Sequence, residues 1–384
     1  MAAIVADAFR AGGTLRIEGG GAAAGLGRPV EADAVLSVAA LAGVLQHEPA
    51  ELFVTARAGT PVELLEATLA ATGQRLPFEP VDTRVLMGGG GEPTMGGLVA
   101  GNWSGPRRIA AGSVRDHLLG ARFVNGRGEA VKSGGRVVKN VTGLDLARLM
   151  CGAHGTLGVV TEATFKLLPI PERSATLVFT GLDDGKAVQA LSAALGSPFE
   201  VSGAAHLPAG IGGVSEPRTL MRLDGVSTAV DYRLQALAAE LTRYGTPAVR
   251  EGEDASRLWR DIRDVRAFAG GEDAVWRVSV APARGPSAAG LIGRERAGRC
   301  FFDWGGGLVW IATAPDGDAG AAAIRKALAV TGGVATLIRA PEAVRRAVPV
   351  FQPLEPGLAA LTRRIKQSLD PEGVLNPGRM EAGH

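Results

Sequence analysis

The feature that most constrains the fold is a glycine-rich stretch at residues 90–116, which reads GGEPTMGGLVAGNWSGPRRIAAGSVRD. Its glycine and proline content fits neither an ordinary helix nor an ordinary strand. Its apolar residues argue against a disordered linker. Glycine lets backbone approach a ligand closely, while Thr, Asn and Ser add hydroxyl and amide groups. The stretch therefore predicts a segment that holds a phosphate or a flat polar ring system against the backbone.

A second glycine loop, at residues 19–27, follows a predicted strand at 14–18. It nearly fits the dinucleotide-binding pattern G-x-G-x-x-G/A. A Rossmann turn, however, must open a helix whose N-terminus receives the pyrophosphate. Here a further predicted strand, 34–38, follows the loop. Strand, glycine loop and strand indicate a phosphate site built from loop N–H groups, although this pattern alone leaves an ordinary Gly/Ala turn equally open.

Length, charge and cysteine content limit the class of protein. The 384 residues allow two or three domains, and the net charge of +2 favours no nucleic-acid partner. Cys151 and Cys300 supply neither a disulfide framework nor zinc-ligand spacing. The first residues lack the pattern of a signal peptide, and no run reaches the roughly 20 apolar residues of a membrane span. We expect a cytoplasmic globular protein.

Periodicity predicts an α+β protein with a domain boundary near residue 172, where Pro169 and Pro171 end a strand. Within the first part, a helix over 62–71 is expected, with Thr60 as its N-cap. Residues 173–344 carry a βαβ-like pattern twice, which predicts an antiparallel sheet covered by helices. The expected organisation is 1–172, divided into subdomains of about 1–80 and 81–172, then 173–344 and a tail at 345–384.

Several residues have a structural and a functional interpretation. Core packing is favoured for Trp276 and Trp310, with a wall over a ligand as the alternative. A helix at 358–369 carries Arg363, Arg364 and Lys366 and is interpreted as a solvated face, with membrane-surface or partner binding as the alternative. His154, in a glycine-rich turn, is either a turn residue or a proton carrier.

The standard catalytic motifs are absent from the sequence. There is no G-x-x-x-x-G-K-[ST] loop, no G-x-S-x-G elbow and no H-E-x-x-H pair. The five histidines are scattered, and none is spaced with another at i, i+4. The sequence therefore assigns no catalytic residue and no metal site.

Taken together, the motifs resemble the PCMH-type FAD-binding domain of the vanillyl-alcohol oxidase and p-cresol methylhydroxylase family. The matching positions are Pro93, Gly96, Gly97, Asn102, Ser104 and Gly105, followed by segments 112–116, 155–162 and 376–378. The resemblance implies a two-subdomain FAD-binding domain at 1–172, a cap domain of doubled ferredoxin-like α+β type at 173–344, and a tail at 345–384 that returns to the FAD domain.

The resemblance also implies which residues bind FAD. Without a histidine in the first glycine loop, we expect non-covalent attachment. The pyrophosphate is expected at Gly19, Gly20, Gly21, Ala22 and Ala23, where alanines replace the usual polar residues. The flavin side is expected at Pro93, Thr94, Gly96, Gly97, Asn102, Ser104, Gly105, Gly112 and Ser113. Val159 and Val160 are expected at the ring edge, and Asn376 in the returning tail.

Within that family the chain resembles most the smaller FAD-binding subunits of bacterial glycolate oxidases, through segments 26–30, 55–61, 105–108, 112–116 and 303–306. Such a subunit implies a complex with a catalytic flavin subunit and an iron–sulfur subunit. The complex oxidises glycolate, a small 2-hydroxy acid, to glyoxylate and passes electrons through flavin to an acceptor. The resemblance leaves room for peripheral attachment to the inner face of the cell membrane through the complex.

Two alternatives stay open. The catalytic relatives carry an H-x-G-D-G-N-x-H-like cluster in their second domain, and this chain has none. The missing cluster and the Ala22-Ala23 loop motivate a flavin-free structural subunit of the same complex. The third interpretation is a free-standing FAD-dependent 2-hydroxy-acid dehydrogenase of the D-lactate type.

Overall fold

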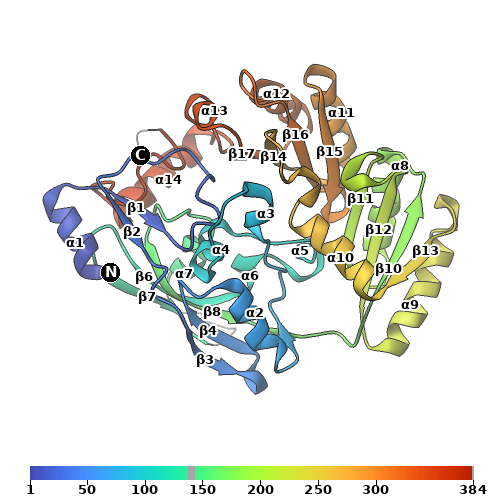
Figure 1. Ribbon diagram of the computed structural model, residues 1–384, viewed down its shortest axis with the longest axis horizontal. Helices are drawn as coiled ribbons and strands as arrows, with labels where there is room; N and C mark the ends of the chain where they lie inside the picture. The colour runs from blue at the N-terminus through green and yellow to red at the C-terminus, as the bar shows by residue number, and fades with distance from the viewer. Residues whose placement is uncertain (137–142, 383–384) are drawn as a thin grey trace. The chain divides into compact units, whose positions relative to one another are not determined.

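The computed structural model describes residues 1–136 and 143–382 (Figure 1). The chain forms two compact units, and neither is one continuous stretch of sequence. Unit 1 comprises Met1–Ser104, Gly112–Ile170 and the chain from Pro349 onward. Unit 2 comprises Gly105–Ala111 and Pro171–Val348. The two units are described separately below.

Unit 1 contains a five-stranded antiparallel sheet in the order β3-β4-β8-β6-β7. Its strands are β3 (Val44–Glu48), β4 (Phe53–Arg57), β6 (Leu118–Val124), β7 (Ala130–Gly134) and β8 (Val159–Lys166). Val54, Ala56 and Phe165 are fully or almost fully buried on this sheet. Strands from both sides of residue 80 therefore share one sheet and one apolar core.

A two-stranded parallel sheet, β1 (Leu15–Glu18) with β2 (Ala34–Ser37), begins at the pair Leu15↔Ala34. No helix follows the glycine loop after β1, as the sequence predicted. On its other side, β1 forms a parallel bridge from Leu15 to Leu375, which lies beyond helix α14 (Pro356–Leu369). The N-terminal strand is thus held between β2 and the C-terminal part of the chain.

Two expectations about helices in unit 1 were wrong. Helix α2 (Val62–Ala70) begins after Pro61, and the Thr60 hydroxyl exchanges hydrogen bonds with the Gly43 backbone instead of capping the helix. The glycine-rich stretch does contain a helix, α4 (Met95–Gly101). Its N-cap, Thr94, accepts a hydrogen bond from the Gly97 N–H at 3.4 Å, and Asn102 ends it in the left-handed conformation at φ 51°.

Unit 2 is built on an eight-stranded antiparallel sheet in the order β13-β10-β12-β11-β15-β16-β14-β17. Each half follows the order β-α-β-β-α-β of a ferredoxin-like motif, and β11 joins β15 at the centre. The first half is β10 (Arg173–Thr180), α8 (Asp184–Gly196), β11 (Val201–Leu207), β12 (Arg218–Gly225), α9 (Ser227–Glu240) and β13 (Ala248–Glu251). The second is β14 (Ala274–Ser279), α11 (Gly285–Glu295), β15 (Gly298–Asp303), β16 (Leu308–Thr313), α12 (Ala321–Thr331) and β17 (Val334–Arg339).

Helices pack on both faces of the first half of this sheet. Alternate residues of β10, including Leu177 and Phe179, bury against side chains of α8 and α9. The opposite face carries α10 (Gly252–Arg263), which lies against β10 and β13 (Figure 1). There Trp259 of α10 donates a hydrogen bond from Nε1 to the Thr176 hydroxyl at 2.9 Å. Trp276 and Trp310 are buried, which confirms their assignment to the core.

Candidate cofactor site

The two glycine segments singled out in the sequence meet in unit 1. Gly21 forms a parallel bridge with Glu92, whose N–H donates to the Gly20 carbonyl at 2.9 Å. A Cβ atom at Gly20 would lie 2.2 Å from the Glu92 carbonyl oxygen, and one at Gly91 would lie 2.1 Å from the Gly20 oxygen. Only glycine permits backbone-to-backbone packing this close. We call residues 19–23 and 91–97 together the cradle.

The first cradle segment presents unused backbone donors. Within the described residues, the N–H groups of Gly19, Gly20 and Gly21 donate no hydrogen bond. The Ala22 side chain is buried, so its methyl group points away from solvent. Because three successive donors stand at the end of a strand, the loop can bind an anion through backbone alone. The alanines that replace the usual polar residues do not remove this capacity.

Two successive glycines of helix α4 lie in different environments. Gly96 is buried, its N–H donates to the Ala58 carbonyl at 2.7 Å, and a Cβ there would lie 2.9 Å from the Ala58 Cβ. Gly97 is exposed, and the nearest atom to a Cβ there is the Thr94 hydroxyl at 3.4 Å. Gly96 therefore allows the helix to pack closely against Ala58, whereas Gly97 leaves a space the size of a side chain next to Thr94.

The polar side chains after α4 form hydrogen bonds with nearby parts of the chain, mostly with backbone N–H groups. Asn102 Oδ1 accepts from the Arg115 N–H at 3.3 Å and from the Cys151 thiol at 3.5 Å. Ser104 Oγ accepts from the Val114 N–H at 3.1 Å. Ser113 donates from both its N–H and its hydroxyl to Asp116 in a capping box that opens α6 (Val114–His117). Gly112 precedes this cap at φ 92°, a conformation that favours glycine.

Asn376 joins three distant segments. Its Oδ1 accepts from the Ile17 N–H at 2.8 Å, two residues before the cradle, and its Nδ2 donates to the His154 carbonyl at 2.9 Å. A Cβ at Gly155 would lie 2.7 Å from that Nδ2. Asn376 is buried and left-handed at φ 45°. The structure therefore gives Asn376 a positioning role beside the cradle, with both ends of its amide already bonded.

Sequence reasoning missed the ion pair that fixes this tail. Lys366 was interpreted as part of a solvated face, but its side chain is only 14% exposed and lies 2.5 Å from Asp370, which is fully buried. Lys366 also donates to the carbonyls of Thr156 and Leu375 at 2.8 and 3.1 Å. Asp370 accepts the N–H groups of Val374 and Leu375. The i, i+4 spacing of Lys366 and Asp370 was the available signal.

The remaining predicted positions divide between the units. Val159 and Val160 begin β8, are buried, and pair with Val124 and Phe123 of β6. Gly105 belongs to unit 2, as part of a segment at 105–111 that we call the strap. The structure thus brings the first loop and α4 together directly and keeps Gly105 in a different packing environment.

Aromatic and charged contacts hold the strap to the sheet of unit 2. Trp304 donates from Nε1 to the Gly105 carbonyl at 3.2 Å, and the Arg108 guanidinium lies 4.6 Å from the Trp304 ring centroid. Arg107 forms a buried ion pair with Asp224 of β12. Burial, with the charge of Arg108 as a second cause, lowers the pKa of the Arg277 guanidinium to about 10.

The described residues of the cradle fit FAD. The cradle offers backbone donors and a space beside Gly97, which suit a phosphate and the ring-bearing part of the cofactor. Within residues 1–136 and 143–382, no three His, Cys, Asp or Glu side chains are placed to bind a metal ion. No helix in the same ranges combines the length and apolar character needed to cross a membrane.

Comparison with known proteins agrees with this geometry. Residues 1–134 match the FAD binding domain family. Solved structures of a 4-ethylphenol oxidase from Gulosibacter chungangensis and of p-cresol methylhydroxylase superpose with TM-scores of 0.75 each, at 15% and 14% identity, over 100% of this chain and 87% of theirs. The fold is therefore the PCMH-type FAD-binding fold that the sequence predicted.

Two curated relatives refine the assignment. Glycolate oxidase subunit GlcD of Bacillus subtilis (strain 168) is 32% identical over 150 residues, which are 39% of this chain and 30% of that protein. Glycolate oxidase subunit GlcE of Escherichia coli (strain K12) is 35% identical over 370 residues, which are 96% of this chain and 93% of that subunit. The chain belongs to the family of FAD-binding oxidoreductase subunits represented by GlcE.

Proposed function

We propose that this chain is the FAD-binding subunit of a glycolate oxidase complex, which oxidises glycolate to glyoxylate and passes the electrons through flavin to an acceptor. The observation that carries the proposal is the 35% identity to GlcE over 96% of the chain. The meeting of the two glycine segments in unit 1 supports it independently, because the residues expected to hold FAD lie side by side.

In this proposal the protein holds FAD without a covalent bond. The N–H groups of Gly19, Gly20 and Gly21 bind the pyrophosphate, and Thr94 with Gly97 borders the flavin side. Asn102, Ser104, Ser113 and Asn376 keep the surrounding backbone in place through the hydrogen bonds described above. The chemistry that FAD supplies when bound is acceptance of a hydride from the carbon that bears the substrate hydroxyl.

Partner subunits complete the proposed reaction. The one histidine of unit 2, His206, is fully buried, and its ring nitrogens lie 2.9 Å from the Thr219 hydroxyl and 3.2 Å from Asp184. Its hydrogen bonds are thus made inside the domain. This supports substrate oxidation in a separate catalytic flavin subunit. The proposed complex also contains an iron–sulfur subunit and attaches to the inner face of the cell membrane.

The first experiment is purification of the chain alone and with its two partners, followed by absorbance spectra before and after denaturation. The proposal expects flavin released from the chain alone, and little reduction of that flavin by glycolate until the partners are added. Absence of flavin from the chain alone, with only the flavin of the catalytic subunit released from the complex, would favour a structural subunit. Rapid bleaching of the flavin absorbance when glycolate or D-lactate is added to the isolated chain would favour a free-standing dehydrogenase.

A substitution tests the position of the cofactor. Gly97→Val places a side chain in the space beside Thr94, and we expect at least a tenfold loss of FAD affinity, or about 1.4 kcal/mol. Gly290→Val is the matched control, because Gly290 is an exposed helical glycine of α11 with nothing within 4 Å of a Cβ. Fluorescence titration with FAD measures both. Equal affinity in the two variants would contradict the placement.

A further inference from the structure

A second pocket with binding character lies in unit 2 and takes no part in the proposed function. It has a volume of about 840 Å³. Five arginines from five separate elements line it, namely Arg218 of β12, Arg250 of β13, Arg257 of α10, Arg266 of the turn after α10 and Arg299 of β15. We call it the arginine pocket. Residues of α10 and of the strands that it covers line the pocket, and Figure 1 shows α10 on that face of the sheet.

Strand register explains why residues distant in sequence converge here. Arg250 pairs with Thr176 and Arg218 pairs with Thr180, on the two sides of β10. Thr176 and Thr180 are four residues apart, so their side chains share a face of the sheet. That face is the one under α10, since Thr176 accepts the hydrogen bond from Trp259. The fold therefore directs both arginines to the same side.

The charges around the pocket are unbalanced. Asp254 and Asp261 are its lining carboxylates, and they pair with Arg257 and with Arg266, the latter at 2.9 Å. Arg299 pairs with Asp273 at 2.9 Å. Within the described residues, Arg218 and Arg250 have no carboxylate within 4.0 Å and make no hydrogen bond through their side chains. Two guanidinium groups therefore stay available to an anion.

Backbone and apolar groups complete the pocket. The turn at Gly210–Gly213 lines one side, with Gly212 at φ 60° and Gly213 at φ 76°. Both glycines belong to the short 3-10 turn Ile211–Gly213, and their exposed backbone lies at the pocket. Leu258, Ile262 and Phe301 form an apolar wall. A cation-rich site beside an apolar wall suits an organic anion better than an inorganic one.

We propose that the arginine pocket binds a small organic anion that carries at least two phosphate or carboxylate charges next to an apolar group. Arg218 and Arg250 bind the charged groups through paired N–H donors. The volume lies within the roughly 300–1,000 Å³ that is usual for small-molecule sites. The proposal does not depend on FAD binding or on glycolate oxidation.

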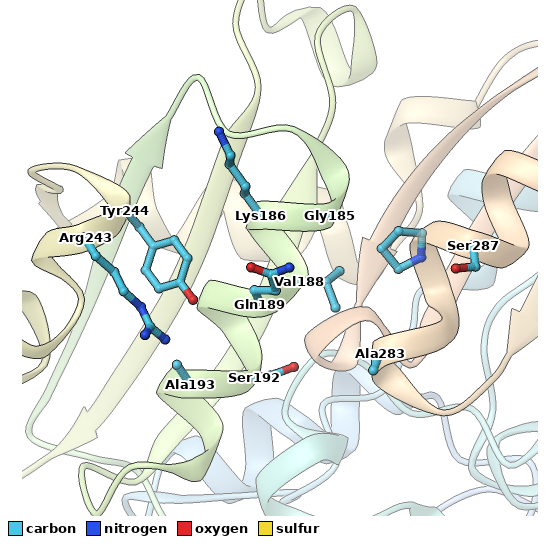
Figure 2. Close-up of a pocket in the computed structure, with 11 residues that line it drawn as sticks. Gly185, Lys186, Val188, Gln189, Ser192, Ala193, Arg243, Tyr244, Ala283 and Ser287 are labelled. Atoms are coloured by element: carbon cyan, nitrogen blue, oxygen red, sulfur yellow. The ribbon is translucent and has the colours of Figure 1, made fainter.

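Another pocket of unit 2 supplies the control. Its volume is about 890 Å³, and Figure 2 shows Arg243 and Tyr244 on one side of α8 with Ala283 and Ser287 on the other. Its two cations are already engaged locally. Arg243 stacks over Tyr244 at 4.8 Å from the ring centroid, and Lys186 lies 3.9 Å from Asp183. Removal of Arg243 changes the net charge of unit 2 without touching the arginine pocket.

Isothermal titration calorimetry on the FAD-loaded chain tests the proposal with three probes: ADP, pyrophosphate and phthalate, a dicarboxylate on an apolar ring. FAD loading keeps ADP out of the cradle. We expect ADP or phthalate to bind with a Kd below about 100 μM and more tightly than pyrophosphate, which lacks an apolar group. In Arg218→Ala/Arg250→Ala the affinity should fall at least tenfold, about 1.4 kcal/mol, and in Arg243→Ala it should not change. Tighter binding of ADP than of the carboxylate probe would identify phosphate as the recognised group, and the reverse order would identify carboxylate.

Lysine variants keep the proposal testable if the double alanine variant is unstable. Arg218→Lys/Arg250→Lys retains both charges but loses the paired donors, so affinity should fall between the parent and alanine values. Thermal unfolding verifies that each variant is folded. The proposal is overturned if no probe binds more tightly than about 1 mM, if the arginine variants bind as the parent does, or if Arg243→Ala weakens binding equally.

Discussion

Substitution of Asn376 by alanine should destabilise unit 1 strongly. The change removes the acceptor for the Ile17 N–H and the donor to the His154 carbonyl; the Asn376 side chain is buried and both hydrogen bonds are partly buried. Each backbone group that loses its partner at such a site costs about 1–3 kcal/mol. Alanine in the left-handed conformation adds about 1–2 kcal/mol, because Asn and Gly tolerate it better. The expected loss is therefore on the order of 3–8 kcal/mol, against a typical stability of about 5–15 kcal/mol.

Urea denaturation followed by circular dichroism gives the free energy of unfolding from the midpoint and slope. Asn376→Gly is the matched variant, because it removes the same amide while keeping the φ of 45° free of strain. We expect the free energy of unfolding of Asn376→Gly to be about 1 kcal/mol higher than that of Asn376→Ala and well below that of the parent. FAD affinity should fall in both variants, since Ile17 leads into the cradle.

The reasoning would be refuted if both variants unfolded within about 1 kcal/mol of the parent. That result would mean that water or a rearranged tail satisfies the Ile17 and His154 groups, and that Asn376 does not position β1. If the alanine variant lost stability and the glycine variant did not, the whole effect would come from the backbone conformation at position 376.

Three further predictions concern contacts outside the cradle. Lys366→Met should cost about 3–5 kcal/mol of unfolding free energy by leaving the Asp370 charge buried and unpaired, whereas Arg364→Met on the exposed side of the same helix should change the melting temperature little. Trp304→Phe should cost about 1–2 kcal/mol in urea denaturation, because it removes the hydrogen bond to the Gly105 carbonyl while keeping an aromatic ring beside the strap. Burial, with the charge of Asp184 as a second cause, raises the pKa of the Cys300 thiol to about 12. The thiol is therefore protonated at pH 8, so alkylation by iodoacetamide should be slow and should rise about tenfold between pH 8 and 9. Rapid labelling of Cys300 at pH 8 would contradict that pKa.

Local patterns predicted much of unit 1 and the architecture of unit 2. Local sequence determines the two strands and the glycine loop at residues 14–38, so apolar periodicity was sufficient to predict them. Apolar periodicity predicted the βαβ-like pattern that occurs twice in unit 2, whereas the doubled ferredoxin-like order was implied by the family resemblance; strands β11 and β13 were missed. Helix α4 was missed because glycine disfavours helices. Capping by Thr94 and burial of Gly96 against Ala58 outweigh that propensity.

Long-range partners set the limit of prediction at the cofactor site. Thr60 has the features of an N-cap, but Gly43 lies within reach of its hydroxyl only in the folded chain. The bond from Ile17 to Asn376 joins residues 359 apart in sequence. Lys366 belongs to an amphipathic pattern, and only the fold brings the Thr156 carbonyl to its ammonium group. No local pattern contains such information.

The strap has a consequence for how this protein could be divided or recombined. A fragment cut at residues 171 and 348 would contain the whole eight-stranded sheet and still be incomplete, because residues 105–111 would be missing. Asp224 would keep only Arg222, at 3.9 Å, and the Trp304 indole would lose its carbonyl partner. An exchange of this domain between homologues therefore needs two pieces of sequence, and a single-cassette chimera should express poorly unless residues 105–111 are exchanged with it.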